Sequence, residues 1–450
     1  MKKKTVCILT AGSGSRMQNY SKNFNKALLP INKKSVISSI IEKFPLDSNF
    51  IIAVGYKKEL IIEFLKINHP KNNFKFVEVK NFSGKRSGPG HSLYMCKKYL
   101  NKPFYFISCD TLWNGEEKLN ADENWMGVPR NSIKEKKNYC NLQIKNNLIS
   151  DIYDKIDTVK ITKPFIGFAY IKSYKQFWDG LKEGKILKNE IQVSSGFKNI
   201  LKSKNKIKYK KFNWVDVGTK KKYQNEIKKH EIFNFSKQSQ YIYINKDSVT
   251  KYFEDSQIIR NLVLKANQNK KVYPQILNSG KNFFSYKFFN GKTFYNYYDS
   301  NNFKKLLFYL DQNLWIKKKI RSQKFMNQCQ SFYYIKTKKR LNLFFKKNKK
   351  LHFNEKTIIN GIKTISIKEL LKKIEWKDIF KGIPFSIHGD LQFDNILYSD
   401  SKKKFQLIDW RPNFSDKVLI GDIYYDFAKL LGGLILNYDY IKNDYFNINI

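Results

Sequence analysis

Two acidic residues and an asparagine lie at short spacing near the carboxyl end of the chain. Asp390 follows a His-Gly pair, Asn395 comes after it on the same loop, and Asp409 follows an apolar run that predicts a strand over 405–408. Phosphoryl transfer needs a carboxylate that orients the attacking hydroxyl, together with oxygen ligands for Mg²⁺ that carries the nucleotide phosphates. The spacing therefore predicts an ATP-dependent phosphotransferase site, with Asp390 as the catalytic residue and Asn395 and Asp409 as the Mg²⁺ ligands.

A second set of residues, near the amino end, has the pattern of a nucleotide-phosphate site. The loop Ala11-Gly12-Ser13-Gly14 follows an apolar run, and Arg16 and Lys26 come after it. Glycines at a turn let backbone N–H groups approach phosphate oxygens, and an arginine adds a forked cation. One chain thus contains two candidate phosphate-handling sites.

The distribution of positive charge along the chain favours small anionic substrates over nucleic acid. Lys and Arg total 85 against 38 Asp and Glu, a net charge of +47. A basic chain of this kind raises nucleic acid as a partner, but the lysines are spread over nearly every segment, without zinc-finger spacing or an aromatic RNA-binding motif. We therefore expect no specific nucleic-acid partner. Nothing in the sequence predicts an oligomeric state.

Cysteine spacing and hydropathy predict a cytoplasmic protein. The five cysteines are scattered, with no pair at a metal-ligand spacing, which favours a reducing compartment without disulfides or zinc. The apolar run after the amino-terminal lysines is too short for a signal peptide. No uncharged run approaches the length of about 20 residues that a membrane helix requires, so we expect no membrane span.

Short β-branched runs alternate with helical patterns in the first half. They predict strands over 5–10, 49–54, 74–79 and 103–108, with helices over 35–44 and 58–67. Such alternation predicts a parallel sheet with helices on both faces. Ligands of such sheets bind at the carboxyl ends of the strands, which is where Gly12, Gly14 and Asp110 fall.

Further motifs follow in a fixed order: Lys26-Ala27-Leu28-Leu29-Pro30, Gly55-Tyr56, Ser87-Gly88-Pro89-Gly90-His91-Ser92 and Trp214-Val215-Asp216-Val217-Gly218-Thr219. With these motifs the chain resembles the sugar-phosphate nucleotidyltransferase family, in the branch that includes bacterial choline-phosphate cytidylyltransferases. The resemblance covers roughly residues 1–228. It implies an α/β, Rossmann-like domain with a mixed, mainly parallel sheet, which transfers a nucleotidyl group from CTP or another nucleoside triphosphate to a phosphorylated small alcohol or sugar.

The resemblance also implies roles for single residues. The residues expected to bind the nucleotide lie in the glycine loops: Ala11, Gly12, Gly14, Gly88 and His91. The residues expected to act on phosphates in catalysis are cations: Arg16, Lys26 and Lys155. Asp110 and Asp216 match the pair that holds Mg²⁺, an ion that prefers carboxylate oxygens.

Simpler structural interpretations compete with these roles. Arg16 can be a solvated surface charge, although its position after a Gly-x-Gly turn favours function. Asp216 can be a turn residue, but a valine on each side favours a partly buried carboxylate. Lys155 lies among many lysines, so a surface role and a catalytic role stay equally open. The His91 ring can simply stack on its loop, and we assign it no proton transfer.

The polar segment 229–240 predicts a linker between a nucleotidyltransferase domain at 1–228 and a second domain at 241–450. The second domain starts with a predicted hairpin over 240–245 and 248–253, with Lys251 in its second strand. A helix over 256–267, a strand over 282–289 and helical stretches over 302–345 follow. A small β-rich lobe before a helical lobe is the order of an α+β, protein-kinase-like fold.

The motif around Asp390 supports the same fold. His388-Gly389-Asp390, Asn395 and Ile408-Asp409-Trp410 resemble choline kinases and aminoglycoside phosphotransferases, whereas protein kinases have His-Arg-Asp and Asp-Phe-Gly at these places. In this interpretation Lys251 binds the ATP phosphates and His388 braces the loop.

Three features depart from that family. No glycine occurs between Ser236 and Phe253, and no obvious glutamate is placed to pair with Lys251. Arg411 stands where an acidic residue often follows in the choline-kinase branch. The chain ends soon after residues 421–433, which predicts a shortened helical lobe.

Together the two motif sets predict a bifunctional enzyme that makes an activated head group for surface polysaccharide or lipid. One half would phosphorylate a small alcohol with ATP, and the other would activate the product with a nucleotide, CTP being favoured by the choline-kinase resemblance. A sugar kinase feeding a UTP- or dTTP-dependent nucleotidyltransferase is the alternative. A nucleotide-sensing protein with a degenerate kinase domain is the second alternative, although the intact carboxylates argue against it.

Overall fold

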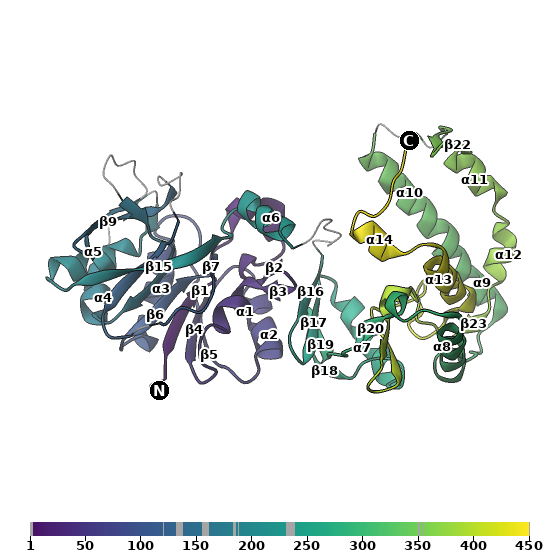
Figure 1. Ribbon diagram of the computed structural model, residues 1–450, viewed down its shortest axis with the longest axis horizontal. Helices are drawn as coiled ribbons and strands as arrows, with labels where there is room; N and C mark the ends of the chain where they lie inside the picture. Colours follow the sequence, from purple (N-terminus) through teal and green to yellow (C-terminus); the bar gives the residue numbers. More distant parts are fainter. Residues whose placement is uncertain are drawn as a thin grey trace. The chain divides into compact units, whose positions relative to one another are not determined.

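A computed structural model describes residues 3–119, 121–131, 138–154, 162–182, 186–187, 189–230, 239–349, 352 and 354–449. The chain forms two compact units: Met1–Ile244 with Thr250–Tyr252, and Asn245–Val249 with Phe253–Ile450 (Figure 1). Residues 231–238, the middle of the expected linker, lie outside the described residues.

One large mixed sheet organises the first unit. Within the described residues its strands follow the order β11-β9-β10-β15-β8-β12-β6-β1-β4-β5, with β7 paired to β15. The run β6-β1-β4-β5 is parallel, as is the β15–β8 pair, whereas β12 runs antiparallel to both of its neighbours. The strands are β1 Thr5–Leu9, β4 Asn49–Val54, β5 Asn73–Glu78, β6 Phe104–Ser108, β7 Thr111–Asn114, β8 Asn124–Pro129, β9 Cys140–Lys145, β10 Leu148–Asp154, β11 Thr162–Pro164, β12 Phe168–Ile171 and β15 Ile207–Asp216.

Helices cover both faces of this sheet, as the alternation predicts. The helices are α1 Val36–Ile41, α2 Lys58–Asn68, α3 Pro89–Met95, α4 Tyr174–Lys182, α5 Ser194–Lys202 and α6 Lys220–Lys228; short strands are β2 Pro30–Ile31, β3 Lys34–Ser35, β13 Ile186–Leu187 and β14 Glu190–Ile191. Local sequence explains where α1 begins, because the Ser35 side chain accepts a hydrogen bond from the N–H of Ser38 at 3.1 Å and so caps it.

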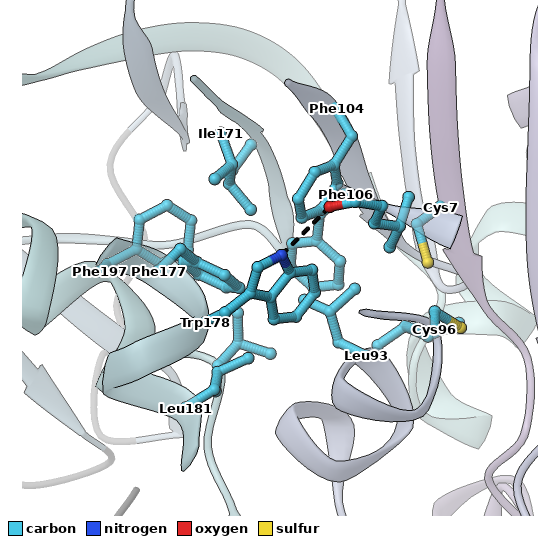
Figure 2. Packing of buried hydrophobic residues seen from close by; sticks show 14 of the residues in the cluster. Cys7, Leu93, Cys96, Phe104, Phe106, Ile171, Phe177, Trp178, Leu181 and Phe197 are labelled. Carbon is cyan, nitrogen blue, oxygen red and sulfur yellow. Dashed lines mark hydrogen bonds between the residues drawn. The ribbon is translucent and has the colours of Figure 1, made fainter. Parts of the chain in front are cut away.

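Alternate residues of the central strands build two separate apolar layers. Cys7 and Phe106 point to the face covered by α3, α4 and α5, where they join Leu93, Trp178 and others in one buried cluster (Figure 2). Trp178 donates from its indole nitrogen to the carbonyl of Leu100 at 3.1 Å, which satisfies its only donor. The strands read as continuous apolar runs because both faces of this sheet are covered.

The strand residues that alternate with those of this cluster point to the opposite face of the sheet, and several of them are aromatic. Phe44, just after α1, packs edge-on against Phe50 and Tyr105, with ring centroids 6.2 and 5.5 Å apart. Strand and helix expectations for this half agree with the structure to within three residues at each end. The carboxyl ends of β1 and β6 are therefore fixed by packing on both sides.

After the large sheet, the chain continues with strands and then helices; β16 and the middle of β17 belong to the first unit, and the elements from α7 onward belong to the second. The hairpin of β16 and β17 belongs to a sheet of order β16-β17-β19-β18, and a smaller sheet has the order β20-β24-β25. The strands are β16 Gln240–Ile244, β17 Ser248–Phe253, β18 Ile276–Ser279, β19 Phe283–Lys287, β20 Lys292–Thr293, β21 Ile358–Ile359, β22 Ile362–Lys363, β23 Pro384–Phe385, β24 Ile396–Ser399, β25 Lys404–Leu407 and β26 Gly421–Asp422.

The helices of the second unit are α7 Ser256–Gln268, α8 Ser300–Asn313, α9 Ser322–Cys329, α10 Lys336–Lys347, α11 Ile367–Lys373, α12 Trp376–Lys381, α13 Ile423–Ile435 and α14 Tyr438–Lys442. A π-helical turn, Gln330–Ile335, joins α9 to α10. Such turns are rare and often occur at functional sites. None of the helices in the described ranges has the length and apolar character that a membrane crossing requires.

Candidate active sites

The glycine loop of the first unit is a tight turn held by its own backbone. Gly14 adopts a left-handed conformation with φ 66°, which a glycine takes without strain. Its carbonyl accepts hydrogen bonds from the N–H of Met17 and from the Ser21 hydroxyl, both at 2.8 Å. The carbonyl of Ala11 is bound by the N–H of Tyr56 at 2.9 Å, so the loop is tied to the residues that follow β4.

Asn25, which sequence reasoning overlooked, fixes the position of the neighbouring lysine. Its amide nitrogen donates to the carbonyls of Thr10 and Tyr56 at 2.9 and 2.8 Å, and its oxygen accepts from the N–H of Ala27 at 3.0 Å. The side chain is fully buried, so each of these bonds replaces one to water. Asn25 thereby ties the β1 loop and the β4 loop to the backbone on either side of Lys26.

Lys26 meets the first expected metal ligand directly. Its Nζ lies 2.7 Å from Oδ2 of Asp110, and a guanidinium nitrogen of Arg16 lies 3.7 Å from the same oxygen. Burial disfavours the charged ammonium, but the Asp110 carboxylate outweighs it, and the pKa of Lys26 is raised. Burial likewise opposes ionisation of Asp110, yet Lys26 and Arg16 hold the pKa of that carboxyl below its usual value. Both groups therefore stay charged at neutral pH.

The second expected ligand reaches the same edge of the sheet through strand pairing. Asp216 ends β15, where it lies opposite Thr111 of β7, the residue after Asp110. Its Oδ1 accepts from the N–H of Gly218 at 2.8 Å. A Cβ placed on Gly218 would lie 2.8 Å from Asp110 Oδ2 and 3.1 Å from Asp216 Oδ1, so both carboxylates face this glycine.

Two residues absent from the motif set complete the surroundings of Asp216. Its Oδ2 is 2.6 Å from Lys222 Nζ and accepts from the Tyr139 hydroxyl at 2.6 Å. Burial and the hydrogen bond to Asp216 raise the pKa of Tyr139 to about 12, so the phenol stays protonated and acts as a donor. Tyr139 packs edge-on against Trp214, with ring centroids 5.5 Å apart.

Two carboxylates fit a Mg²⁺ ion that travels with a nucleotide. Among the described residues, no group of three or more His, Cys, Asp or Glu side chains gathers as a metal cage. Mg²⁺ in phosphate-transfer sites is instead held by one or two carboxylates, substrate phosphates and water. Asp110 and Asp216 would supply the protein ligands, and the ion would neutralise charge that develops on the phosphates.

The contact at Gly218 gives a test of this arrangement. We expect Gly218→Ala to lower nucleotidyl-transfer activity about 100-fold, because the added methyl group displaces the two carboxylates by a fraction of an ångström or more. The clash falls on the ends of side chains, so the thermal unfolding midpoint should stay close to that of the unsubstituted protein. Gly432→Ala in α13, whose methyl would meet nothing within 4 Å, serves as the control. Unchanged activity in Gly218→Ala would contradict the pairing of Asp110 and Asp216 as metal ligands.

Of the other residues predicted for this site, the structure describes Gly88 and His91 but not Lys155. Gly88 precedes α3, and its loop is bound to β14 through the N–H of Ile191, which donates to the Ser87 carbonyl at 2.8 Å. His91, in the first turn of α3, is half-buried; burial and the nearby Arg86 lower its pKa. Lys155 lies outside the described residues.

In the second unit, His388 braces the loop that carries Asp390. The ring nitrogen Nδ1 accepts from the N–H of Asp390 at 3.2 Å, so Nε2 carries the proton and donates to the carbonyl of Ile408 at 2.9 Å. Complete burial, with Lys265 nearby, lowers the pKa of His388 to about 4. The imidazole is therefore neutral and links the Asp390 loop to the strand end before Asp409, as a structural brace would.

Asp426 fixes the same loop from the side of α13. Its two oxygens accept from the N–H groups of His388 and Gly389 at 2.8 and 2.7 Å, and the indole N–H of Trp315 donates to it at 3.2 Å.

A buried lysine also holds this loop. Lys265 of α7 donates to the carbonyls of His388 and Arg411 at 3.2 Å each. These buried contacts hold the loop before any substrate binds, which is the positioning that phosphoryl transfer depends on.

The structure also brings Asp390 and Asn395 together. Asn395 Nδ2 donates to the Asp390 carbonyl at 2.8 Å, and the Asn395 carbonyl accepts from the N–H of Ile408 at 2.9 Å. The next residue, Asp409, has a left-handed backbone with φ 58°, a conformation that recurs at functional sites. The amide oxygen of Asn395 and the carboxylate of Asp409 fit Mg²⁺, which would neutralise the transferring phosphate. Lys251 is buried in the middle of β17, in the segment Thr250–Tyr252 that belongs to the first unit.

Asp390 has a lysine partner that sequence reasoning did not identify. Lys429 of α13 places its Nζ 2.9 Å from Asp390 Oδ1. Burial works against the Lys429 ammonium, but the hydrogen bond to Asp390 outweighs it and raises the pKa of Lys429. Over a third of the Asp390 side chain remains exposed, so a substrate hydroxyl can reach it.

The comparisons with known proteins concern the first half of the chain. No family model matches the chain. The bifunctional protein GlmU of Methanocaldococcus jannaschii is 30% identical over 220 residues, which are 47% of this chain and 50% of that protein. A D-glycero-alpha-D-manno-heptose 1-phosphate guanylyltransferase of Campylobacter jejuni is 28% identical over 121 residues, 26% of this chain and 52% of that protein. The amino-terminal half matches sugar-phosphate nucleotidyltransferases. The chain spans about half the length of the curated relatives it matches.

Solved structures align with about half of the chain. A UDP-glucose pyrophosphorylase complexed with UDP-glucose has a TM-score of 0.45 and 19% identity, covering 51% of this chain and 98% of its own. A CTP:phosphocholine cytidylyltransferase from Streptococcus pneumoniae has a TM-score of 0.41 and 18% identity, covering 50% of this chain and 98% of its own.

Proposed function

We propose that the first unit is a nucleotidyltransferase that joins a nucleoside monophosphate to a phosphorylated small alcohol or sugar. The acceptor's phosphate oxygen attacks the α-phosphorus of the nucleoside triphosphate, and pyrophosphate leaves. The observation that carries this proposal is the meeting of Asp110, Asp216 and Lys26 beside the glycine loop. The match of the amino-terminal half to sugar-phosphate nucleotidyltransferases supports it.

Charge neutralisation explains the residue types at this site. Lys26 and Arg16 approach the carboxylate edge from the glycine-loop side, and Lys222 approaches it from α6. Cations and Mg²⁺ placed around the α-phosphate favour the transition state, in which negative charge moves towards the leaving pyrophosphate. The roles of Gly12, Gly14, Gly88 and Lys155 in binding nucleotide and acceptor remain part of this proposal.

We further propose that the second unit phosphorylates the alcohol that the first unit then activates. The braced loop of His388 and Asp390, with Asn395 hydrogen-bonded to it, supports this step. Asp390 would orient the acceptor hydroxyl, and Asn395 and Asp409 would hold Mg²⁺. A contact of Lys251 with the ATP phosphates is proposed from its place in the sequence alone. Domains at 1–228 and 241–450 on one chain would keep the shared intermediate at high local concentration.

The choice of nucleotide is the finer part of the proposal. We expect CTP, because the motifs around Asp390 resemble those of choline kinases; CDP-linked head groups, whatever the charge of the alcohol, would be the corresponding products, for surface polysaccharide or lipid. UTP, dTTP and GTP are the competing donors.

A product survey tests the proposal. The protein is incubated with Mg²⁺, ATP, each nucleoside triphosphate and a panel of alcohols and sugars, and products are identified by mass. We expect pyrophosphate release and a nucleotide-linked product, with CTP the best donor. Pyrophosphate release from UTP or dTTP with a sugar 1-phosphate, and none from CTP, would favour the sugar pathway instead. Nucleotide binding, read as a shift in melting temperature, without turnover of any acceptor would contradict an enzymatic role.

A further inference from the structure

A cationic pocket lies beside the Asp390 loop of the second unit. It has a volume of about 330 Å³ and lies between the π-helical turn, the start of α10 and the segment after Trp410. Its lining includes Phe332, Lys336, Lys339, Arg340, Arg411 and Asn413. None of the described residues that line it is acidic.

Two of its cations share one aromatic ring. Lys336 Nζ lies 3.8 Å from the centroid of the Phe332 ring, and Arg411 Cζ lies 4.9 Å from it. Within the described ranges, no carboxylate forms an ion pair with Lys336, Arg340 or Arg411, and the buried Nε of Arg411 has no hydrogen-bond partner. A buried donor without a partner is costly, and the cluster gathers several cations without a protein counter-ion among the described residues.

The electrostatics of Lys336 agree with this geometry. Burial, followed by the charges of Arg411, Arg340 and Lys429, lowers the pKa of Lys336 to about 7, and Asp390 is the one carboxylate that acts in the opposite direction. Like charges gathered in a half-buried site repel one another. An anion bound among them would relieve that repulsion.

Backbone contacts place the pocket next to the expected catalytic residue. The N–H of Arg411 donates to the His388 carbonyl at 3.0 Å. Gly389, with φ 85°, lies so close to Arg411 that a Cβ at this position would be 2.7 Å from the Arg411 Cβ. The Arg411 side chain therefore packs against the residue that precedes Asp390. The pocket therefore adjoins the loop that carries Asp390.

We propose that the acceptor of the second unit is an alcohol that carries a compact anion, a carboxylate or a phosphate, which Lys336, Arg340 and Arg411 bind while its hydroxyl faces Asp390. This inference rests on the proposed phosphotransferase function. In the reaction, the acceptor hydroxyl oxygen forms a bond to the γ-phosphorus of ATP and the bond from that phosphorus to the β,γ-bridging oxygen breaks. ADP leaves, and the hydroxyl proton passes to the Asp390 carboxylate. A quaternary amine would meet like charges here.

Matched acceptors and one exposed cation test the proposal. ATP consumption is measured with glycerate and glycerol 3-phosphate, each against glycerol, and with ribose 5-phosphate against ribose; choline is the cationic acceptor. We expect kcat/KM for each anionic acceptor to be at least about tenfold higher than for its uncharged counterpart. Arg340→Gln should lower kcat/KM for the anionic acceptors about tenfold. Comparison of glycerate with glycerol 3-phosphate distinguishes carboxylate from phosphate. Lys346→Gln, on the same helix but outside the pocket lining, should change nothing.

Other results would overturn the inference. Preferred turnover of glycerol or choline, unchanged in Arg340→Gln, would exclude an anion-selective pocket while leaving the phosphotransferase function intact. A higher KM for ATP in Arg340→Gln, with unchanged KM for the acceptor, would assign the cations to the nucleotide instead.

A binding measurement separates the pocket from the reaction. Calorimetric titration of glycerol 3-phosphate and glycerate without ATP should show binding that weakens at least about tenfold in Arg340→Gln and Lys336→Gln. If no alcohol consumes ATP but this pattern holds, the phosphotransferase function fails and the anion site stands. If neither anion binds, the inference fails.

Discussion

Asp110→Asn is expected to lower pyrophosphate release by about a thousandfold or more, since it removes a charged metal ligand at the point where phosphate charge develops. The substitution keeps the shape of the side chain but leaves Lys26, 2.7 Å away, without its counter-charge. ATP consumption with an alcohol acceptor should continue at the rate of the unsubstituted protein, because Asp390 and its loop belong to the second unit. Both rates are measured on the same preparation, one by pyrophosphate and one by ADP.

Asp47→Asn is the matched control for this experiment. Asp47 is exposed in the turn before β4, so the same change of charge should leave both rates unaltered. Pyrophosphate release that survives in Asp110→Asn at more than a tenth of the original rate would rule out Asp110 as a metal ligand.

Asp390→Asn should have the opposite effect and reduce ATP-dependent phosphorylation about a thousandfold. An amide orients the hydroxyl less well and takes no proton, whereas the loop itself stays held by the hydrogen bonds from its backbone N–H groups to Asp426. Pyrophosphate release with a ready-made phosphorylated acceptor should remain. Asp378→Asn, at an exposed position in α12, controls for the loss of one charge in the second unit.

The pair of variants decides whether the two units act separately. Loss of both activities in either variant would contradict two independent sites. If Asp390→Asn phosphorylated the alcohol at the full rate, the proposed phosphotransferase site would be wrong and only the nucleotidyltransferase proposal would stand.

Continuous apolar runs made the core of the first unit predictable. The runs at 5–10 and 49–54 became β1 and β4, because a parallel strand covered on both faces has few polar residues. The positions of Gly12, Gly14 and Asp110 at strand ends followed from the same pattern. The antiparallel strands β9 to β12 were not predicted, since their short runs depend on pairing partners distant in sequence.

The site residues that escaped prediction are those whose roles depend on tertiary contacts. Lys222 is one of three consecutive lysines in a chain with 85 basic residues, and only the proximity of α6 to Asp216 distinguishes it. Asn25 directly precedes Lys26, but asparagine is common in loops, and the three hydrogen bonds of its side chain are visible only in the folded structure. The sequence already marked Arg411 as a departure from the choline-kinase pattern. Its neighbours Lys336 and Arg340 on α10 could be identified only from the folded structure.

The ion pairs in the first unit have a consequence for the order in which ligands bind. Lys26 and Lys222 act as internal counter-ions, each occupying one oxygen of a carboxylate that is expected to bind metal. The free site is thus already neutralised, and a lone divalent cation must compete with two tethered ammonium groups. In the proposed reaction, nucleotide phosphates would draw these ammonium groups away and bring their own metal, which would free both carboxylates at that moment. Mg²⁺ would then bind to this site together with the nucleotide and not before it.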